Sequence, residues 1–193
     1  MKKIILTILF LVLSFSNLNS KTKVNIIHEG NIDSKVQLIV YESLTCGHCA
    51  NFHKNIYPNL KKDFIDKGLL KIEFRNFPLD AAAFNASKVA HCKNDGKSDI
   101  LHFLFNKQEV WAKGDTVEQF NLNLKELINK ENFGIDFDKC LNNKEIEDHV
   151  LNDRIEGTKK FNVNATPTII INNKKFDKPI NYKNIKKSIE KLI

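Results

Sequence analysis

The chain has 193 residues, of which 30 are Lys or Arg and 23 are Asp or Glu, so its formal net charge is +7. The charges are mixed along the chain, and no basic stripe is interleaved with aromatic residues, which argues against binding to nucleic acid. The length suffices for one domain with a hydrophobic core of its own.

The first twenty residues have the pattern of a secretory signal peptide. Met1-Lys2-Lys3 gives a positive start, residues 4–13 are almost entirely apolar, and residues 14–20 mix Ser and Asn with apolar residues. The apolar run is shorter than the about 20 residues that a membrane-spanning helix needs. We therefore expect residues 1–20 to direct export, and the alternative is an uncleaved N-terminal anchor.

The next part of the chain predicts a strand, a helix and a second strand. Residues 36–41 form an apolar run with β-branched residues, and residues 69–74 alternate between apolar and charged side chains. Between them, residues 49–67 are predicted to be helical, because apolar residues recur at Phe52, Ile56, Leu60 and Phe64. Pro58 is expected to kink this helix. The order resembles the start of a thioredoxin-like core.

The middle of the chain is predicted to be helical. The helical patterns cover residues 81–93, 100–111, 117–129 and 137–142, with glycines between them. We interpret residues 80–143 as a helical insert. Residues 24–79 and 144–193 are then the two parts of one thioredoxin-like domain.

The last part begins with a predicted helix over residues 144–160. A strand over residues 168–171 follows Pro167, turns at Asn172-Asn173 and is expected to pair with a short strand at Lys175-Phe176. The last twelve residues have the pattern of an amphipathic helix.

The motif Cys46-Gly47-His48-Cys49 lies where the first predicted strand gives way to the helix. A thiol attacks a disulfide only as the thiolate, so exchange needs one cysteine with a lowered pKa and another to resolve the mixed disulfide. Cys46 is expected at the helix N-terminus, where unpaired N–H groups and the helix dipole favour negative charge. A protonated His48 would add to this effect. We therefore predict that Cys46 is the nucleophile and Cys49 the buried resolving partner.

The same motif has two other interpretations, an inert disulfide and half of a zinc site. No second C-x-x-C motif occurs, Cys92 and Cys140 stand singly, and His53 follows the motif by one helical turn. The strand-to-helix context favours exchange chemistry without a metal or a cofactor. We expect His53 to be a surface or half-buried residue, and His91 and His102 to be surface or satisfied core residues.

Three segments, in order, resemble those of a known family. Residues 42–50 (Glu-Ser-Leu-Thr-Cys-Gly-His-Cys-Ala), 74–80 (Phe-Arg-Asn-Phe-Pro-Leu-Asp) and 165–168 (Ala-Thr-Pro-Thr) are similar to segments of DsbA-like thiol–disulfide oxidoreductases. The resemblance implies an α/β, thioredoxin-like fold with an inserted all-helical subdomain. It also implies that Pro167 is cis and faces the cysteines, with Thr166 exposing backbone groups to an extended substrate peptide. From the residues alone, Pro167 could simply begin a strand.

The chain departs from the family pattern at two positions. Gly47 stands where DsbA-like oxidases often have proline, so the motif also resembles that of protein disulfide isomerases. Their potentials of about −120 mV for DsbA and about −180 mV for the isomerase suggest a milder oxidant with some isomerase competence. Val40 stands where the family often has an acidic residue. Glu42, two residues on, is expected to face the same side, and assistance to proton transfer from Cys49 is a hypothesis.

The resemblance also bears on the two remaining cysteines. In some α-proteobacterial members of the family a second disulfide joins similar positions of the helical domain, which implies a structural Cys92–Cys140 bond. In the chain-entropy model, closing a loop of about 50 residues would stabilise the fold by roughly 4 kcal/mol. The alternative is two buried free thiols.

We therefore expect a periplasmic enzyme that donates its disulfide to reduced exported polypeptides. A membrane-bound partner of DsbB type would reoxidise it, and a monomer is expected. The near alternative is a disulfide isomerase or reductase. The alternative from another class is a non-catalytic protein, either a metal carrier or a holdase with an apolar surface at Phe84, Phe103, Phe105 and Phe120.

Overall fold

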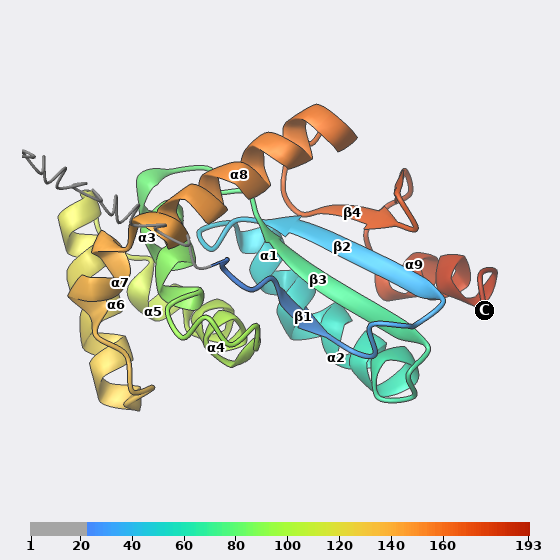
Figure 1. The fold of residues 1–193 in the computed structure, drawn as a ribbon, viewed down its shortest axis with the longest axis horizontal. Coiled ribbons are helices and arrows are strands. Elements are labelled where there is room, and N and C mark those ends of the chain that lie inside the picture. The colour runs from blue at the N-terminus through green and yellow to red at the C-terminus, as the bar shows by residue number, and fades with distance from the viewer. Residues whose placement is uncertain (1–22) are drawn as a thin grey trace, which may run out of the picture.

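A mixed sheet forms the centre of the computed structural model, which describes residues 23–193 (Figure 1). Its strands lie in the order β1-β3-β2-β4-β5. They are β1 (Ile27–Glu29), β2 (Val36–Glu42), β3 (Leu70–Asn76), β4 (Thr168–Ile171) and β5 (Lys174–Lys175). β2 and β3 are parallel, and the other neighbouring pairs are antiparallel. The expected signal peptide, residues 1–20, lies outside the described residues.

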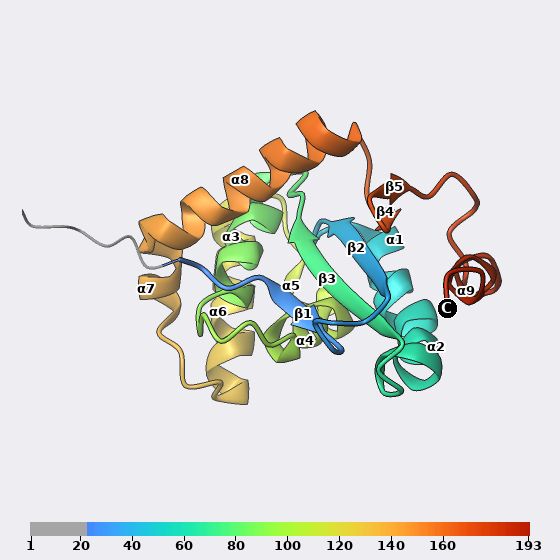
Figure 2. The ribbon, with the colours of Figure 1, turned by 45° about the vertical axis from the view of Figure 1, so that its right-hand side comes forward.

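The central strand β2 separates two hydrophobic layers, because successive side chains of a strand point to opposite faces. Val36, Leu38 and Val40 are buried in the larger core. Ile39 and Tyr41 pack in a second cluster on the other face. The smaller cluster lies beneath α8 (Lys144–Phe161), whereas α9 (Tyr182–Glu190) and the helical segment after β2 cover the larger one (Figures 1 and 2).

The helical segment after β2 is not a regular α-helix. It consists of α1 (Gly47–Asn51), the π-helical η1 (Phe52–Ile56), α2 (Tyr57–Leu60) and the π-helical η2 (Lys61–Ile65). The four apolar residues that recur every four positions are all buried. A repeat of four exceeds the 3.6 residues of an α-helical turn, and the wider π turns keep the stripe on one face. The disturbance expected at Pro58 takes the form of a change from π to α hydrogen bonding, since Pro58 has no N–H to donate.

Between β3 and α8 the chain forms the predicted helical insert. Its helices are α3 (Ala81–Ala90), α4 (Asp99–Asn106), α5 (Gln108–Trp111), α6 (Val117–Glu131) and α7 (Phe137–Asn142). A disulfide joins Cys92, just after α3, to Cys140 in α7, with 5.3 Å between their Cα atoms. This is the pairing that the family resemblance implied.

Two local predictions were wrong, and one strand was missed. The helix expected over residues 100–111 is interrupted at Lys107, where the Trp111 indole N–H donates to the Leu104 carbonyl oxygen and takes an acceptor that a continuous helix would use. Strand β1 was not predicted, because three residues are too short to show a period of two. The last hairpin strand is Lys174–Lys175, one residue earlier than expected.

A buried polar cluster fixes α8 against the rest of the molecule. Asp153 of α8 accepts hydrogen bonds from Arg75 Nη1 at 3.0 Å and from the backbone N–H and side-chain amide of Asn76 at 3.0 and 2.8 Å. Toward the N-terminus of α8, Glu147 pairs with Lys88 of α3 at 3.1 Å. One helix is therefore bonded both to the sheet and to the insert.

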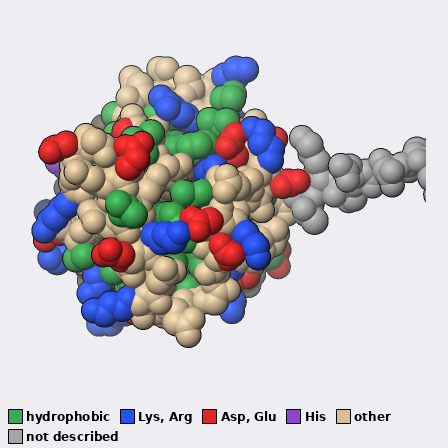
Figure 3. Space-filling view, turned by 90° about the vertical axis from the view of Figure 1, so that its left-hand side faces the viewer, with side chains coloured by type: hydrophobic (Ala, Val, Ile, Leu, Met, Phe, Trp, Pro, Cys, Tyr) green, Lys and Arg blue, Asp and Glu red, His purple; other side chains and the backbone are tan. Residues whose placement is uncertain are grey.

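The surface of the insert does not present the four phenylalanines proposed for an apolar binding face. Phe105 is buried, and Phe84, Phe103 and Phe120 are half-buried. On the side of the molecule where the insert lies, basic and acidic side chains are interspersed with small hydrophobic patches (Figure 3). In residues 23–193, each helix is too short or too polar to cross a bilayer.

Candidate active site

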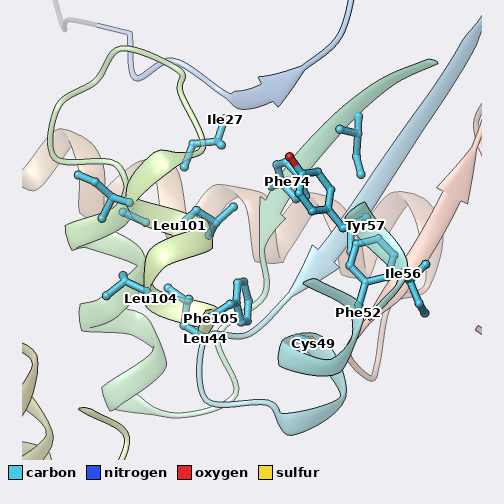
Figure 4. Close-up of a cluster of buried hydrophobic side chains, with 14 of the residues drawn as sticks. Ile27, Leu44, Cys49, Phe52, Ile56, Tyr57, Phe74, Leu101, Leu104 and Phe105 are labelled. Atoms are coloured by element: carbon cyan, nitrogen blue, oxygen red, sulfur yellow. The ribbon is translucent and has the colours of Figure 1, made fainter. Parts of the chain in front are cut away.

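The two cysteines of the motif occupy the first turn of α1. Cys46 is the N-cap residue, with an extended backbone, and its side chain is half-buried. Cys49 is fully buried in the larger core beside Leu44 and Phe52 (Figure 4). Both are free thiols in this structure. One sulfur is thus accessible for attack, and the other is sequestered one turn behind it.

The surroundings of Cys46 favour its thiolate. A hydrogen bond from the Cys49 thiol lowers the pKa of Cys46 most strongly. Burial opposes this effect, but Thr166 and the backbone N–H groups of Cys49 and His48 also stabilise the thiolate, and the pKa falls to about 5. At neutral pH, Cys46 is therefore a thiolate, the form that attacks disulfides. The His48 ring itself is exposed.

Cys49 has the opposite character. Burial, the hydrogen bond that it gives to Cys46 and the nearby charge of Glu42 all raise the pKa of the Cys49 thiol. Cys49 therefore keeps its proton while Cys46 is ionised. To attack a mixed disulfide, it must first lose that proton to a neighbouring group.

The loop before β4 faces Cys46. The Thr166–Pro167 peptide bond is cis, and the Thr166 carbonyl oxygen lies 3.4 Å from Cys46 Sγ, where it can accept a hydrogen bond from the protonated thiol. Thr168 Oγ1 donates to the Ala165 carbonyl oxygen at 2.7 Å, which braces the turn from within. Thr166, which the sequence analysis assigned to substrate contact, thus lies beside the half-buried sulfur of Cys46.

The helical insert holds the strand-to-helix loop in place. Gln108 Nε2 donates to the carbonyl oxygens of Leu44 and Cys46, at 2.7 and 3.2 Å. Thr45 Oγ1 donates to Asp80 Oδ2, at 2.6 Å, at the start of α3. Sequence reasoning missed Gln108, because a lone glutamine in a helical pattern carries no chemical signal.

Glu42 lies beneath the cysteines at the end of β2. As expected from strand alternation, it points to the same face as Val40, toward the helix that carries Cys49. Its side chain is 4% exposed, and burial raises its pKa well above the usual range for a carboxyl group. Oε2 lies 2.7 Å from His53 Nε2, whereas Oε1 has no hydrogen-bond partner among the described residues.

The expectation of a surface or half-buried His53 was wrong. The π-helical turn directs its side chain into the space between β2 and α4, where it stacks on Phe105 with 4.0 Å between ring centroids. Its Nδ1 lies 2.8 Å from Nδ1 of His102, whose Nε2 lies 2.8 Å from Glu29 Oε1. Four polar residues far apart in the sequence thus form one continuous line of hydrogen bonds.

Two observations concern the interpretation of the motif as half of a zinc site. His53 bonds to Glu42 and His102 and not to either thiol. Within residues 23–193, no group of three His, Cys, Asp or Glu side chains is placed to hold a metal ion. The arrangement instead combines a nucleophilic thiolate, a protonated thiol one turn away and an open peptide loop beside them.

The chain is similar to known proteins in both sequence and fold. The thioredoxin family model matches residues 22–191. Disulfide bond formation protein D of Bacillus subtilis is 31% identical over 179 residues, covering 84% of this chain and 74% of that protein. The crystal structure of α-DsbA1 from Wolbachia pipientis superimposes with a TM-score of 0.77 at 30% identity, over 87% of this chain and 90% of that one. Oxidised BdbD of B. subtilis gives a TM-score of 0.71 at 28% identity, over 86% and 91%.

The match to longer relatives is partial. A relative from Rickettsia bellii is 29% identical over 147 residues, which are 74% of this chain but 55% of that protein. A relative from Rickettsia conorii is 31% identical over 42% of its own length. The chain therefore spans about half the length of these rickettsial relatives.

Proposed function

Because the chain belongs to the thioredoxin family, as a DsbA-like member, we propose that it is a thiol–disulfide oxidoreductase that introduces disulfide bonds into exported proteins. The observation that carries the proposal is the lowered pKa of Cys46, about 5, beside the buried Cys49 thiol. Stabilising the thiolate stabilises the reduced form of the pair. A pair with a stabilised reduced form gives up its disulfide readily and is an oxidant.

The reaction follows from the two positions. A substrate thiolate attacks Cys46 Sγ of the oxidised pair, the Cys46–Cys49 bond breaks, and its electron pair goes to Cys49 Sγ. A second substrate thiolate then attacks the substrate sulfur of the mixed disulfide, and Cys46 leaves as a thiolate. Its low pKa makes Cys46 a good leaving group in this second step.

Substrate binding is assigned to the loop at Thr166 and Pro167. The loop lies against Cys46, so an extended peptide that pairs with it would bring its sulfur to the exposed thiol. On the other side, a cleft of about 390 Å³ between α1 and α5 begins at Gly47 and is lined by Lys54, Asn55 and Glu109. Its polar lining suits a backbone or a polar side chain of the same peptide.

The cellular setting belongs to the same proposal. Residues 1–20 act as the export signal, and residues 24–79 and 144–193 form the catalytic domain around the insert of residues 80–143. The monomeric enzyme works in the periplasm on reduced exported polypeptides. A membrane-bound partner of DsbB type restores its disulfide.

The test is the reduction potential of residues 21–193. The protein is equilibrated in glutathione buffers of graded ratio, and the free thiols are alkylated and assigned by mass analysis. A potential between about −120 and −190 mV for the Cys46–Cys49 pair supports an oxidant, and the less oxidising end of this range fits the Gly47-His48 pair and an added isomerase activity. A potential below about −230 mV contradicts the proposal and indicates a reductase.

A further inference from the structure

We propose that His53 and His102 form a proton relay that connects Glu42, beneath Cys49, with solvent at Glu29. The inference rests on the proposed exchange function, in which Cys49 must gain and lose a proton although it is fully buried. The relay answers the question of where that proton goes.

The four relay residues come from four separate elements that meet beside the cysteines. Glu42 ends β2, His53 lies in η1, His102 in α4 and Glu29 ends β1. Their three contacts measure 2.7 Å (Glu42 Oε2 to His53 Nε2), 2.8 Å (Nδ1 to Nδ1) and 2.8 Å (His102 Nε2 to Glu29 Oε1). These are hydrogen-bond distances, so no gap interrupts the line.

The line runs from the interior to the surface. The side chains of His53 and Glu42 are 1% and 4% exposed, whereas those of His102 and Glu29 are 18% and 16% exposed. His102 stacks on Tyr57 at 4.2 Å, and Tyr57 lies with Phe74 and Phe105 in the apolar space between α4 and the helix that carries Cys49 (Figure 4). Water therefore reaches only the Glu29 end.

Glu29 determines that His102 carries a hydrogen on Nε2, at the outer end of the line. Burial works against its charge, but hydrogen bonds from His102, Ser98 and Tyr57 outweigh burial and lower its pKa to about 2. Lys61 Nζ, 3.7 Å away, adds a positive charge. Glu29 is thus a carboxylate that only accepts, so His102 Nε2 must carry a hydrogen.

His53 carries a single hydrogen, because burial lowers its pKa to about 3. Two arrangements then satisfy every hydrogen bond. In the first, a protonated Glu42 donates to His53 Nε2, and His53 Nδ1–H donates to a neutral His102. In the second, a positively charged His102 donates to His53 Nδ1, and His53 Nε2–H donates to the Glu42 carboxylate. Moving two protons, each across one hydrogen bond, interconverts them.

The second arrangement prepares Glu42 for the exchange step. Its Oε1, which has no other partner among residues 23–193, can accept the Cys49 proton. Cys49 Sγ then bonds to Cys46 Sγ, the mixed disulfide breaks, and the substrate sulfur leaves with the electron pair as a thiolate. One proton then passes from His102 to water at the Glu29 end, which leaves Glu42 protonated and His102 neutral. The reverse sequence protonates Cys49 when it is the leaving group.

Other charged groups around the line set its pH response. They are Cys46 and Cys49 from α1, Tyr57 from α2, Lys61 from η2, Asp66 after η2 and Asp99 from α4. Of these, only the two cysteines change charge in the exchange step. A pH effect that depends on His102 therefore reports on the relay, provided that the ionisation of Cys46 is measured separately.

The experiment follows the reduced protein as it reacts with glutathione disulfide, which forms a mixed disulfide on Cys46 that Cys49 must resolve. In His102→Gln and His53→Gln, we expect resolution to slow at least about tenfold, so that the mixed disulfide accumulates, since positioned proton transfer contributes about 10²–10⁴-fold to rates. Alkylation of Cys46 in the same variants should stay within about twofold of wild type. Free imidazole should restore part of the rate in His102→Ala, because His102 is partly exposed.

His28→Gln serves as the matched control, since His28 neighbours Glu29 on β1 but is exposed. Should His53→Gln fail to fold, the His102 variants decide. Wild-type resolution in His102→Gln, or a slow His102→Ala that imidazole does not accelerate, overturns the relay and leaves the exchange function intact. If the wild-type protein forms no mixed disulfide at all, the proposed function fails and the relay fails with it.

Discussion

Two cysteines within one helical turn have opposite electrostatic environments. Cys46 gains hydrogen bonds from the Cys49 thiol and from backbone N–H groups of the first helical turn, whereas Cys49 is enclosed by apolar side chains and lies near a carboxyl group. The division needs no charged residue beside Cys46. It follows from the position of each sulfur relative to the helix end, and it separates the attacking group from the resolving group.

This division predicts a pH-dependent stability for the reduced protein. The pKa of Cys46 falls from 9.0 to about 5 on folding, so its contribution is present at high pH and is lost as the pH falls through about 5. Thermal unfolding should show that the advantage of reduced wild type over Cys46→Ser shrinks between pH 8 and pH 5. Parallel unfolding curves for the two proteins over this range would contradict the lowered pKa.

At the scale of elements, a glycine in α1 and a glycine in α8 differ in whether a side chain would be tolerated there. A Cβ at Gly47, in the first turn of α1, would meet nothing within 4 Å. In α8, by contrast, a Cβ at Gly157 would lie 2.7 Å from Cε1 of Tyr41. Gly157 is therefore the point where α8 approaches the sheet, whereas Gly47 is conformationally replaceable.

Gly47→Ala should raise the free energy of unfolding by about 0.4–1 kcal/mol, because alanine restricts the unfolded chain and meets no neighbour in the fold. Gly157→Ala should lower it by about 1–3 kcal/mol, since Tyr41 is buried and must shift. Urea unfolding of the oxidised forms measures both. Equal effects of the two substitutions would show that packing against Tyr41 is not what distinguishes them.

The elements differ in how far their sequences predict them. The strands β2 and β4 and the helices α6 to α8 carry a clear period, and their predicted ranges agree with the structure to within two residues. The π-helical turns depend on how the apolar stripe meets the sheet, which is a tertiary effect. They also bury His53, so its hydrogen bonds with Glu42 and His102, and the bond between His102 and Glu29, could not be predicted from local patterns. The cysteine motif, by contrast, is local and could be predicted.

At the scale of the whole molecule, one helix links the sheet to the insert. Asp153 is 3% exposed and satisfies Arg75 and Asn76 of β3, while Glu147 of the same helix pairs with Lys88 of α3. Because the insert also supplies Gln108 to the loop before Cys46, the position of α8 affects the active site through the insert.

Asp153→Ala should lower the free energy of unfolding by about 3 kcal/mol, since it leaves buried donors of Arg75 and Asn76 without their acceptor. The control is Glu156→Ala, because Glu156 is 45% exposed and 3.8 Å from Arg75, and its effect should stay below about 0.5 kcal/mol. Denaturant unfolding compares the two. A similar decrease in the free energy of unfolding in both variants would show that the burial of Asp153 does not determine its contribution to stability.

The two borders of the described sheet have a consequence for a protein that meets unfolded chains. The outer strands β1 and β5 have 3 and 2 residues, and β5 consists of two exposed lysines. The outward N–H of His28 in β1 is already occupied by the Gly96 carbonyl oxygen, at 3.1 Å. An unfolded polypeptide therefore finds too few free backbone N–H and C=O groups at either border to add a strand to the sheet. This reduces co-aggregation of the protein with the unfolded chains around it.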